Sequence, residues 1–117
     1  MVLATLRRDG SPHLVPICAV VIDRNVYFAV DEVKPKSTPR LQRLTNLAED
    51  PRVSLLASCY NDADWSRLWW VRIDGTAREV GRDERETALV ALREKFTQYA
   101  AQVPSGPVVQ ILPGSAT

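Results

Sequence analysis

The sequence predicts a mostly β protein of the α+β class, a six-stranded antiparallel barrel, closed or split, with two short helices. Short runs of β-branched and aromatic residues are joined by tight turns, which is typical of a meander. Only two stretches have helical periodicity, and strand–helix–strand crossovers are not repeated, which disfavours a doubly wound parallel sheet. The 117 residues suffice for one ordinary domain, so we expect a single domain over residues 1–117.

The first half of the chain predicts three strands, over residues 2–6, 13–22 and 26–30. The first turn contains Asp9-Gly10, because aspartate and glycine tolerate a positive φ. The second strand is long and apolar but contains Pro16, which cannot donate a ladder hydrogen bond. That position must therefore be an edge, a bulge or an opening of the sheet.

The second half adds two helices and three strands. Thr38 is the expected N-cap of the first helix, with Pro39 at the first helical position, and Asp50-Pro51 ends it. Strands are expected over residues 52–59 and 67–80, with a bend or bulge at Gly75, and over residues 108–112. The second helix opens with cap-like spacing at Asp83, and its apolar stripe comprises Ala88, Leu89, Leu92, Phe96 and Tyr99.

Composition excludes several classes of protein. The net charge of +1 provides no global field toward nucleic acid or anionic lipid, and no apolar run approaches the roughly 18 residues of a spanning helix. The N-terminus lacks a basic region followed by an apolar stretch, so we expect a cytoplasmic protein. Cys18, Cys59 and the only histidine, His13, form no metal-binding pattern, and both cysteines are expected to be small buried residues.

A basic loop before the first helix is the strongest candidate for ligand binding. It contains two of the three lysines and two hydroxyl side chains: Lys34, Lys36, Ser37 and Thr38. Ammonium groups beside a helix N-terminus favour a phosphate or diphosphate. A solvated charged loop is the alternative interpretation of the same pattern.

Two further features complete a candidate site. Val15, Pro16 and Ile17 are apolar and interrupt the strand ladder, so a flat ring has room to lie against them; an edge-strand proline is the alternative. Trp65, Trp69 and Trp70 fall within six positions. Such density is typical of a core or a subunit interface, but an alternating strand points Trp69 and Trp70 to opposite faces, so one of them needs a partner surface or a ligand.

No side chain is indicated as a catalytic nucleophile, acid or base. His13 has no serine–acid or cysteine neighbours in a catalytic pattern, and no phosphate-loop or dinucleotide-binding motif is present. Arg40 and Arg43 share a helix face and could extend the anion-binding site. Solvated arginines are the alternative interpretation. If the protein is an enzyme, a cofactor performs the chemistry.

The ordered set of motifs resembles the pyridoxamine-phosphate-oxidase-like, FMN-binding split-barrel family. The resemblance rests on the segments 9–17, 26–30 and 34–38, and the segments 50–56 and 65–75 are similar to its deazaflavin-dependent branch. It implies a homodimer of split β-barrels, with coenzyme F420, or alternatively FMN, at the subunit interface. The cofactor ring would contact Val15, Pro16 and Ile17.

The resemblance also implies residue roles and an activity. Lys34, Lys36, Ser37 and Thr38 would hold the cofactor phosphate, and Trp69 and Trp70 would border the site. The implied activity is hydride transfer between the deazaflavin and a small unsaturated organic substrate, with no nucleic acid, membrane or metal involved. A non-catalytic module that binds flavin or haem, and a purely structural dimer, are the alternatives.

Overall fold

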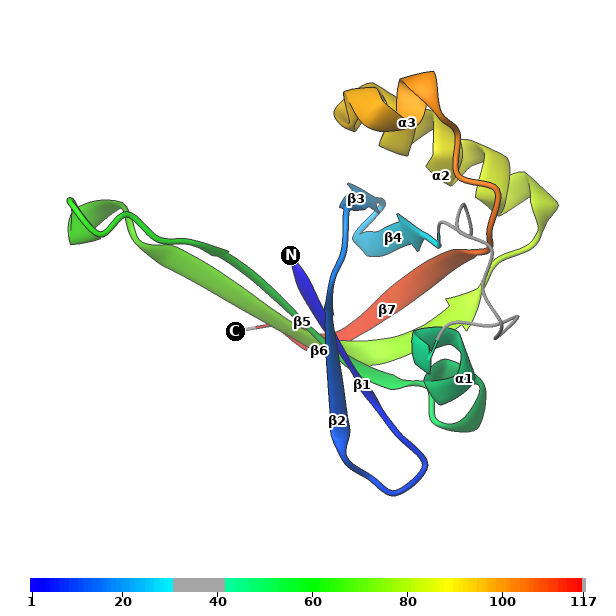
Figure 1. Ribbon diagram of the computed structural model, residues 1–117, viewed down its shortest axis with the longest axis horizontal. Helices are drawn as coiled ribbons and strands as arrows, with labels where there is room; N and C mark the ends of the chain where they lie inside the picture. Colours follow the sequence, from blue (N-terminus) through cyan, green and yellow to red (C-terminus); the bar gives the residue numbers. More distant parts are fainter. Residues whose placement is uncertain (31–41, 117) are drawn as a thin grey trace.

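The computed structural model describes residues 1–30 and 42–116. Seven strands form one antiparallel sheet in the order β2-β1-β5-β6-β7-β4-β3 (Figure 1). The strands are β1 (Val2–Leu6), β2 (Pro12–Pro16), β3 (Ala19–Ile22), β4 (Asn25–Ala29), β5 (Arg52–Cys59), β6 (Trp69–Glu79) and β7 (Val108–Ala116). The described helices are α1 (Gln42–Glu49), α2 (Arg82–Lys95), α3 (Thr97–Ala101) and the short 3-10 helix η1 (Trp65–Arg67).

The sheet closes on itself between β2 and β3. These two strands stand at opposite ends of the strand order, yet only Ile17 and Cys18 separate them in the chain. Three peptide units span at most about 11 Å, so the two edges of the sheet must meet there. The predicted barrel is therefore confirmed, and it is split at this point.

The prediction of six strands is wrong by one, because the segment 13–22 forms two strands rather than one. Pro16 has no N–H to continue the ladder, and the Ile17 N–H bonds to the Met1 carbonyl at 2.9 Å. Pairing with β4 then begins at Ala19, opposite Phe28. The proline thus ends one strand, and the next begins on the other edge of the barrel.

Turn chemistry explains the hairpins. Gly10 has φ +85°, and the Asp9 carboxylate accepts hydrogen bonds from the Ser11 N–H at 2.9 Å and hydroxyl at 2.6 Å. Asp23 and Arg24 both have positive φ, as the tight β3–β4 turn requires. The predicted irregularity at Gly75 is a register shift, and a Cβ there would collide with the Leu112 carbonyl oxygen.

Two apolar clusters stabilise the barrel. The first fills its interior and includes Leu3, Phe28, Leu55 and Ile111, with Leu44 contributed by α1. The second lies between α2 and the outside of the sheet and includes Tyr27, Ala29, Ala88, Leu89, Leu92 and Val108. Figure 1 shows α1 near one end of the barrel, and α2 with α3 beside β3 and β4.

The helices differ from the predictions in two ways. The cap of α2 is Gly81, so Asp83 and Glu84 lie in the first turn, where their charges favour the helix dipole. The predicted second helix ends at Lys95, because Phe96 has extended dihedral angles (φ −118°, ψ 110°). The predicted N-cap of the first helix, Thr38, lies outside the described residues. No helix in the described ranges is long and apolar enough to cross a membrane.

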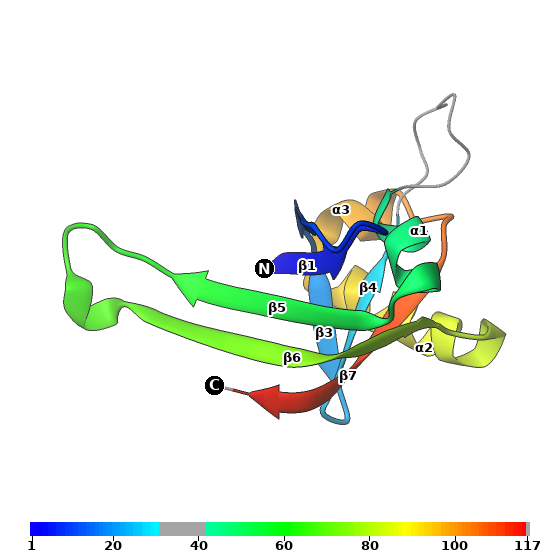
Figure 2. The same cartoon turned by 90° about the horizontal axis from the view of Figure 1, so that it is seen from below.

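The β5–β6 hairpin projects far beyond the barrel (Figures 1 and 2). β1 pairs with β5 only through residues 54–56, and β7 pairs with β6 only from Ile73 onward. Residues 57–59 and 69–71 therefore pair only with each other within the described ranges. This arm contains Trp65, Trp69 and Trp70, all exposed.

Candidate functional site

A hollow of about 250 Å³ lies where the two edges of the barrel meet. It is lined by residues from the β2–β3 break, the end of β4, α1 and α3: Pro16, Ile17, Cys18, Ala29, Arg43 and Tyr99. The fold brings these residues together because β2 must end at Pro16 and β3 must begin on the opposite edge. The hollow therefore exists for the same reason that the barrel is split.

Helix α1 delivers Arg43 to this hollow. Leu44 is buried in the barrel core, and the Asn46 side chain donates to the Thr5 hydroxyl at 2.9 Å. Gln42 in turn donates to the Asn46 side-chain oxygen at 2.7 Å. These contacts fix the helix against β1 and hold Arg43, the residue beside Leu44, at the barrel split.

The Arg43 guanidinium is a partly buried cation with an unused donor. Its Nε is buried and has no hydrogen-bond partner among the described residues. Burial lowers the pKa of Arg43, and the nearby Tyr99 phenol opposes that shift. A buried donor without a partner is costly, and an anion in the hollow would satisfy it.

The surroundings of Arg43 are electropositive. Burial lowers the pKa of His13, and the charges of Arg7 and Arg43 lower it further. The His13 Nδ1 is also buried without a hydrogen-bond partner in the described part of the chain. Because the positive charges of Arg7 and Arg43 both act on His13, this region favours an anionic ligand group over a cationic one.

The structure brings together only part of the predicted ligand site. Pro16 and Ile17 line the hollow, whereas Val15 is not among its lining residues and packs against the barrel core. The Ile17 N–H is already bonded to Met1, so neither position 16 nor position 17 has a backbone donor to offer a ring. The predicted phosphate-binding residues Lys34, Lys36, Ser37 and Thr38 lie outside the described residues.

The two predicted tryptophans point to opposite faces of β6, as the alternation requires. Trp70 lines an apolar groove of about 620 Å³ on the outer face of the sheet, together with Val2, Leu14, Leu56, Tyr60 and Arg72. Trp69 is not among the lining residues of that groove and is 52% exposed. Val2 is also the cross-strand partner of Pro16, so the groove approaches the hollow at this pair.

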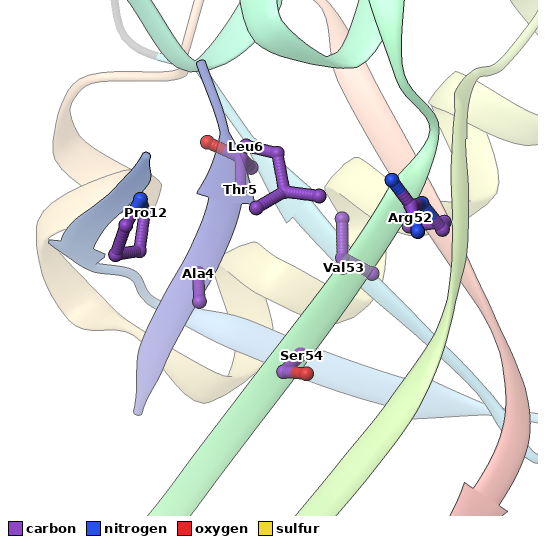
Figure 3. A pocket seen from close by; sticks show the side chains of 7 residues that line it. All are labelled: Ala4, Thr5, Leu6, Pro12, Arg52, Val53 and Ser54. Atoms are coloured by element: carbon purple, nitrogen blue, oxygen red, sulfur yellow. The ribbon is translucent and has the colours of Figure 1, made fainter. Parts of the chain in front are cut away.

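In a third, smaller hollow, the polar side chains of Thr5, Arg52 and Ser54 each already have a hydrogen-bond partner. This hollow has about 190 Å³ and is lined by Ala4, Thr5, Leu6, Pro12, Arg52, Val53 and Ser54 (Figure 3). The Arg52 guanidinium is bonded to the Asp50 carboxylate at 2.7 Å, and the Thr5 hydroxyl is bonded to Asn46. This volume is also below the about 300 Å³ of ordinary ligand pockets.

Three assignments from the sequence change in the structure. Cys18 and Cys59 are exposed, so the prediction that both are buried is wrong: Cys18 lies in the strand break and Cys59 on the projecting arm. Tyr99, predicted to belong only to an apolar stripe, also lines the hollow. In the sequence, Arg43 stands beside the apolar stripe of α1. That position alone does not reveal that its guanidinium is partly buried.

A family model described as pyridoxamine 5'-phosphate oxidase matches residues 1–115. The chain belongs to the pyridoxamine 5'-phosphate oxidase family. The predicted resemblance is thereby confirmed at the level of the family and its split-barrel fold, and the match spans both the hollow and the projecting arm. No curated protein matches the sequence.

Solved structures share the fold of this family member. A conserved hypothetical protein, Rv2991 from Mycobacterium tuberculosis, is 26% identical with a TM-score of 0.78, over 98% of this chain and 72% of that chain. HutZ, a haem storage protein from Vibrio cholerae, is 16% identical with a TM-score of 0.76, over 99% and 82%. An FAD-binding protein from Mesorhizobium loti is 17% identical with a TM-score of 0.71, over 98% and 81%.

Proposed function

We propose that the protein is an F420-dependent oxidoreductase, a reductase that transfers hydride between the deazaflavin and a small unsaturated organic substrate. The observation that carries the proposal is the Arg43 guanidinium, with its unpartnered Nε, in the hollow at the barrel split. Family membership and similarity to an FAD-binding protein support a flavin-type cofactor. FMN is the alternative cofactor.

The described residues fit the two ends of such a cofactor. Arg43 offers a charged, forked donor to a phosphate, and Pro16 with Ile17 offers an apolar surface to a flat ring. The hollow alone, at about 250 Å³, holds less than a whole dinucleotide-sized or flavin-sized ligand. The rest of the cofactor must therefore extend beyond it, toward the outer groove or a second chain.

The chain's own residues would bind, orient and shield the cofactor, with no catalytic side chain assigned. A bound deazaflavin would supply the hydride chemistry. Arg43 would fix the phosphate end, and Pro16 and Ile17 would fix the plane of the ring. Lys34, Lys36, Ser37 and Thr38 would add charge and hydroxyl donors to the phosphate, and Val15 would support the ring from the core side.

A homodimer is part of the same proposal. The outer groove exposes Leu14, Leu56 and Trp70, and the arm exposes Trp69 on its other face. Exposed apolar surface of this extent marks an interface. A C₂ dimer is the commonest arrangement for such a chain. In it, Trp69 and Trp70 of one chain would border the site of the other.

Titration of the purified protein with F420, FMN and haem, followed by fluorescence and absorbance, tests the proposal. We expect F420 to bind most tightly, and we expect its reduced form, supplied in the assay, to be oxidised when it passes hydride to added unsaturated substrates. Tight FMN binding without F420 binding would make the protein an FMN enzyme. Binding without turnover across a broad substrate panel would favour the non-catalytic module, for which the likeness to a haem storage protein offers support at the level of fold.

A double variant separates the contribution of Lys34 and Lys36 to phosphate binding from that of Arg43. Lys34→Ala/Lys36→Ala should weaken F420 binding by about tenfold or more, because each charge-assisted hydrogen bond contributes about 1.5–3 kcal/mol. The phosphate-free deazaflavin is the control ligand, and its affinity should change little. Unchanged F420 affinity would assign Lys34 and Lys36 to a solvated loop and leave Arg43 as the anchor.

A further inference from the structure

The corner between α2 and α3 positions the Tyr99 side chain at the barrel split. Phe96 is both the C-cap of α2 and the N-cap of α3. Its N–H bonds to the Leu92 carbonyl at 2.8 Å, and its own carbonyl accepts from the Tyr99 N–H at 3.0 Å. The backbone of the corner is thereby fixed, and Tyr99 lies one turn beyond it.

Side-chain contacts tie this corner to the edge of the hollow. Lys95 Nζ donates to the Ala19 carbonyl at 2.8 Å, and Ala19 is the first residue of β3 after the strand break. The same ammonium lies 5.3 Å from the centre of the Phe96 ring. The Phe96 and Tyr99 rings meet edge to face, with centres 5.8 Å apart. Tyr99 thus contacts Phe96, and Lys95 links Phe96 to the start of β3.

Tyr99 is an amphipathic side chain at the edge of the hollow. Its ring packs beside the cluster under α2, and the side chain also lines the hollow with Arg43, Pro16 and Ile17. A tyrosine combines a flat apolar body with a hydroxyl that donates to anions. Its position beside a partly buried guanidinium gives that hydroxyl an electropositive neighbour.

We propose that Tyr99 is a ligand-binding residue that selects a phosphate-bearing, flat ligand, with its hydroxyl donating to the same anionic group that Arg43 holds and its ring walling the hollow opposite the β2–β3 break. This inference rests on the proposed function and extends it to α3. Lys95 is a positioning residue, because it acts on the ligand only through the corner and the start of β3. The selected ligand class is a phosphorylated flavin or deazaflavin.

The test compares ligand pairs that differ mainly in the phosphate arm: FMN with riboflavin, and F420 with its phosphate-free deazaflavin. Tyr99→Phe removes one hydroxyl and keeps the ring. We expect it to weaken binding of the phosphorylated member about tenfold and leave the phosphate-free member unchanged. Equal affinities for wild type and Tyr99→Phe would overturn the inference, and an equal loss for both members of a pair would also overturn it.

A second pair of variants tests the positioning role. Lys95→Met should weaken both members of a ligand pair to a similar extent, by several-fold, since the wall moves rather than a phosphate donor being lost. Arg93→Met removes a cation from the same last turn of α2 and should leave both affinities unchanged. A phosphate-selective loss in Lys95→Met, or no loss, would contradict the positioning role. If wild type binds neither pair, the proposed function itself fails; binding that is insensitive to Tyr99→Phe refutes this inference alone.

Discussion

Two neighbouring residues of β5 show how the barrel differs from the projecting arm. Leu55 faces the interior and is 1% exposed, whereas Leu56 faces the outer groove and is 42% exposed. Farther along the same hairpin, Trp70 is 47% exposed on the groove side and Trp69 is 52% exposed on the other. The arm thus carries apolar side chains on both faces that its own chain does not cover.

The difference separates folding from association. The barrel interior buries its large side chains within one chain. Substitutions there should therefore lower the free energy of unfolding. The large apolar side chains of the arm and the outer groove can be buried only against a second molecule. Substitutions there should therefore change association. The split of the barrel adjoins the outer groove at the Val2–Pro16 pair and is where we expect ligand binding.

The largest expected effect is in the barrel interior. Phe28→Ala removes a side chain that is 1% exposed and should lower the free energy of unfolding by about 3–5 kcal/mol. Trp65→Ala, on the exposed tip of the arm, is the matched aromatic control and should change it by about 0.5 kcal/mol or less. Denaturant unfolding measures both, and similar losses would contradict the division between barrel and arm.

The next largest effect concerns the dimer. Trp70→Ala should weaken association by about 2 kcal/mol or more, as expected for a tryptophan at the centre of an interface, with little change in the unfolding of the isolated chain. Sedimentation across a concentration series measures the dissociation constant. A wild-type chain that remains a monomer at micromolar concentration would remove both the dimer and the shared site.

Arg43→Gln tests the ligand site at the barrel split. It should weaken binding of a phosphorylated cofactor by about 1.5–3 kcal/mol, which is tenfold or more. It should not destabilise the fold, since it removes a partly buried charge whose Nε has no hydrogen-bond partner among the described residues. Arg8→Gln, in the exposed β1–β2 turn, is the control. Calorimetric titration of both variants should show the loss only for Arg43→Gln.

The smallest effect is expected at an exposed ion pair. Side-chain hydrogen bonds from Arg52 lower the pKa of Asp50 from 3.8 to about 2. Because the folded-state pKa is depressed, the stabilisation is present above the unfolded pKa and is lost as pH falls through about 2. Asp50→Asn should therefore differ from wild type in thermal unfolding near neutral pH, and the difference should shrink between about pH 4 and pH 2. A constant difference across that range would exclude this pair as the cause.

Local chemistry made much of the fold predictable. Positive φ at Gly10 and the irregularity at Gly75 follow from residue type, and the alternation of Trp69 and Trp70 follows from strand geometry. Pro16 indicated an interruption of the ladder. The sequence did not reveal that the chain changes edges there, because closure of the barrel depends on pairings between distant strands.

The candidate site was less predictable for a related reason. Pro16 and Ile17 could be selected because a proline in an apolar strand is conspicuous. Arg43 and Tyr99 sit on helices where a solvated arginine and a core aromatic are the ordinary interpretations, and only the docking of α1 and α3 brings them to one hollow. The exposure of Cys59 likewise depends on how far the hairpin projects beyond its neighbouring strands.

Cofactor affinity measured across a dilution series of the protein tests the central claim most directly, because that claim joins the hollow at the barrel split to the arm of a second chain. If the site is shared, F420 or FMN binding and dimerisation are thermodynamically linked. The account predicts that cofactor affinity falls as the chain dissociates and that saturating cofactor tightens the dimer. An affinity that is the same for monomer and dimer would contradict it.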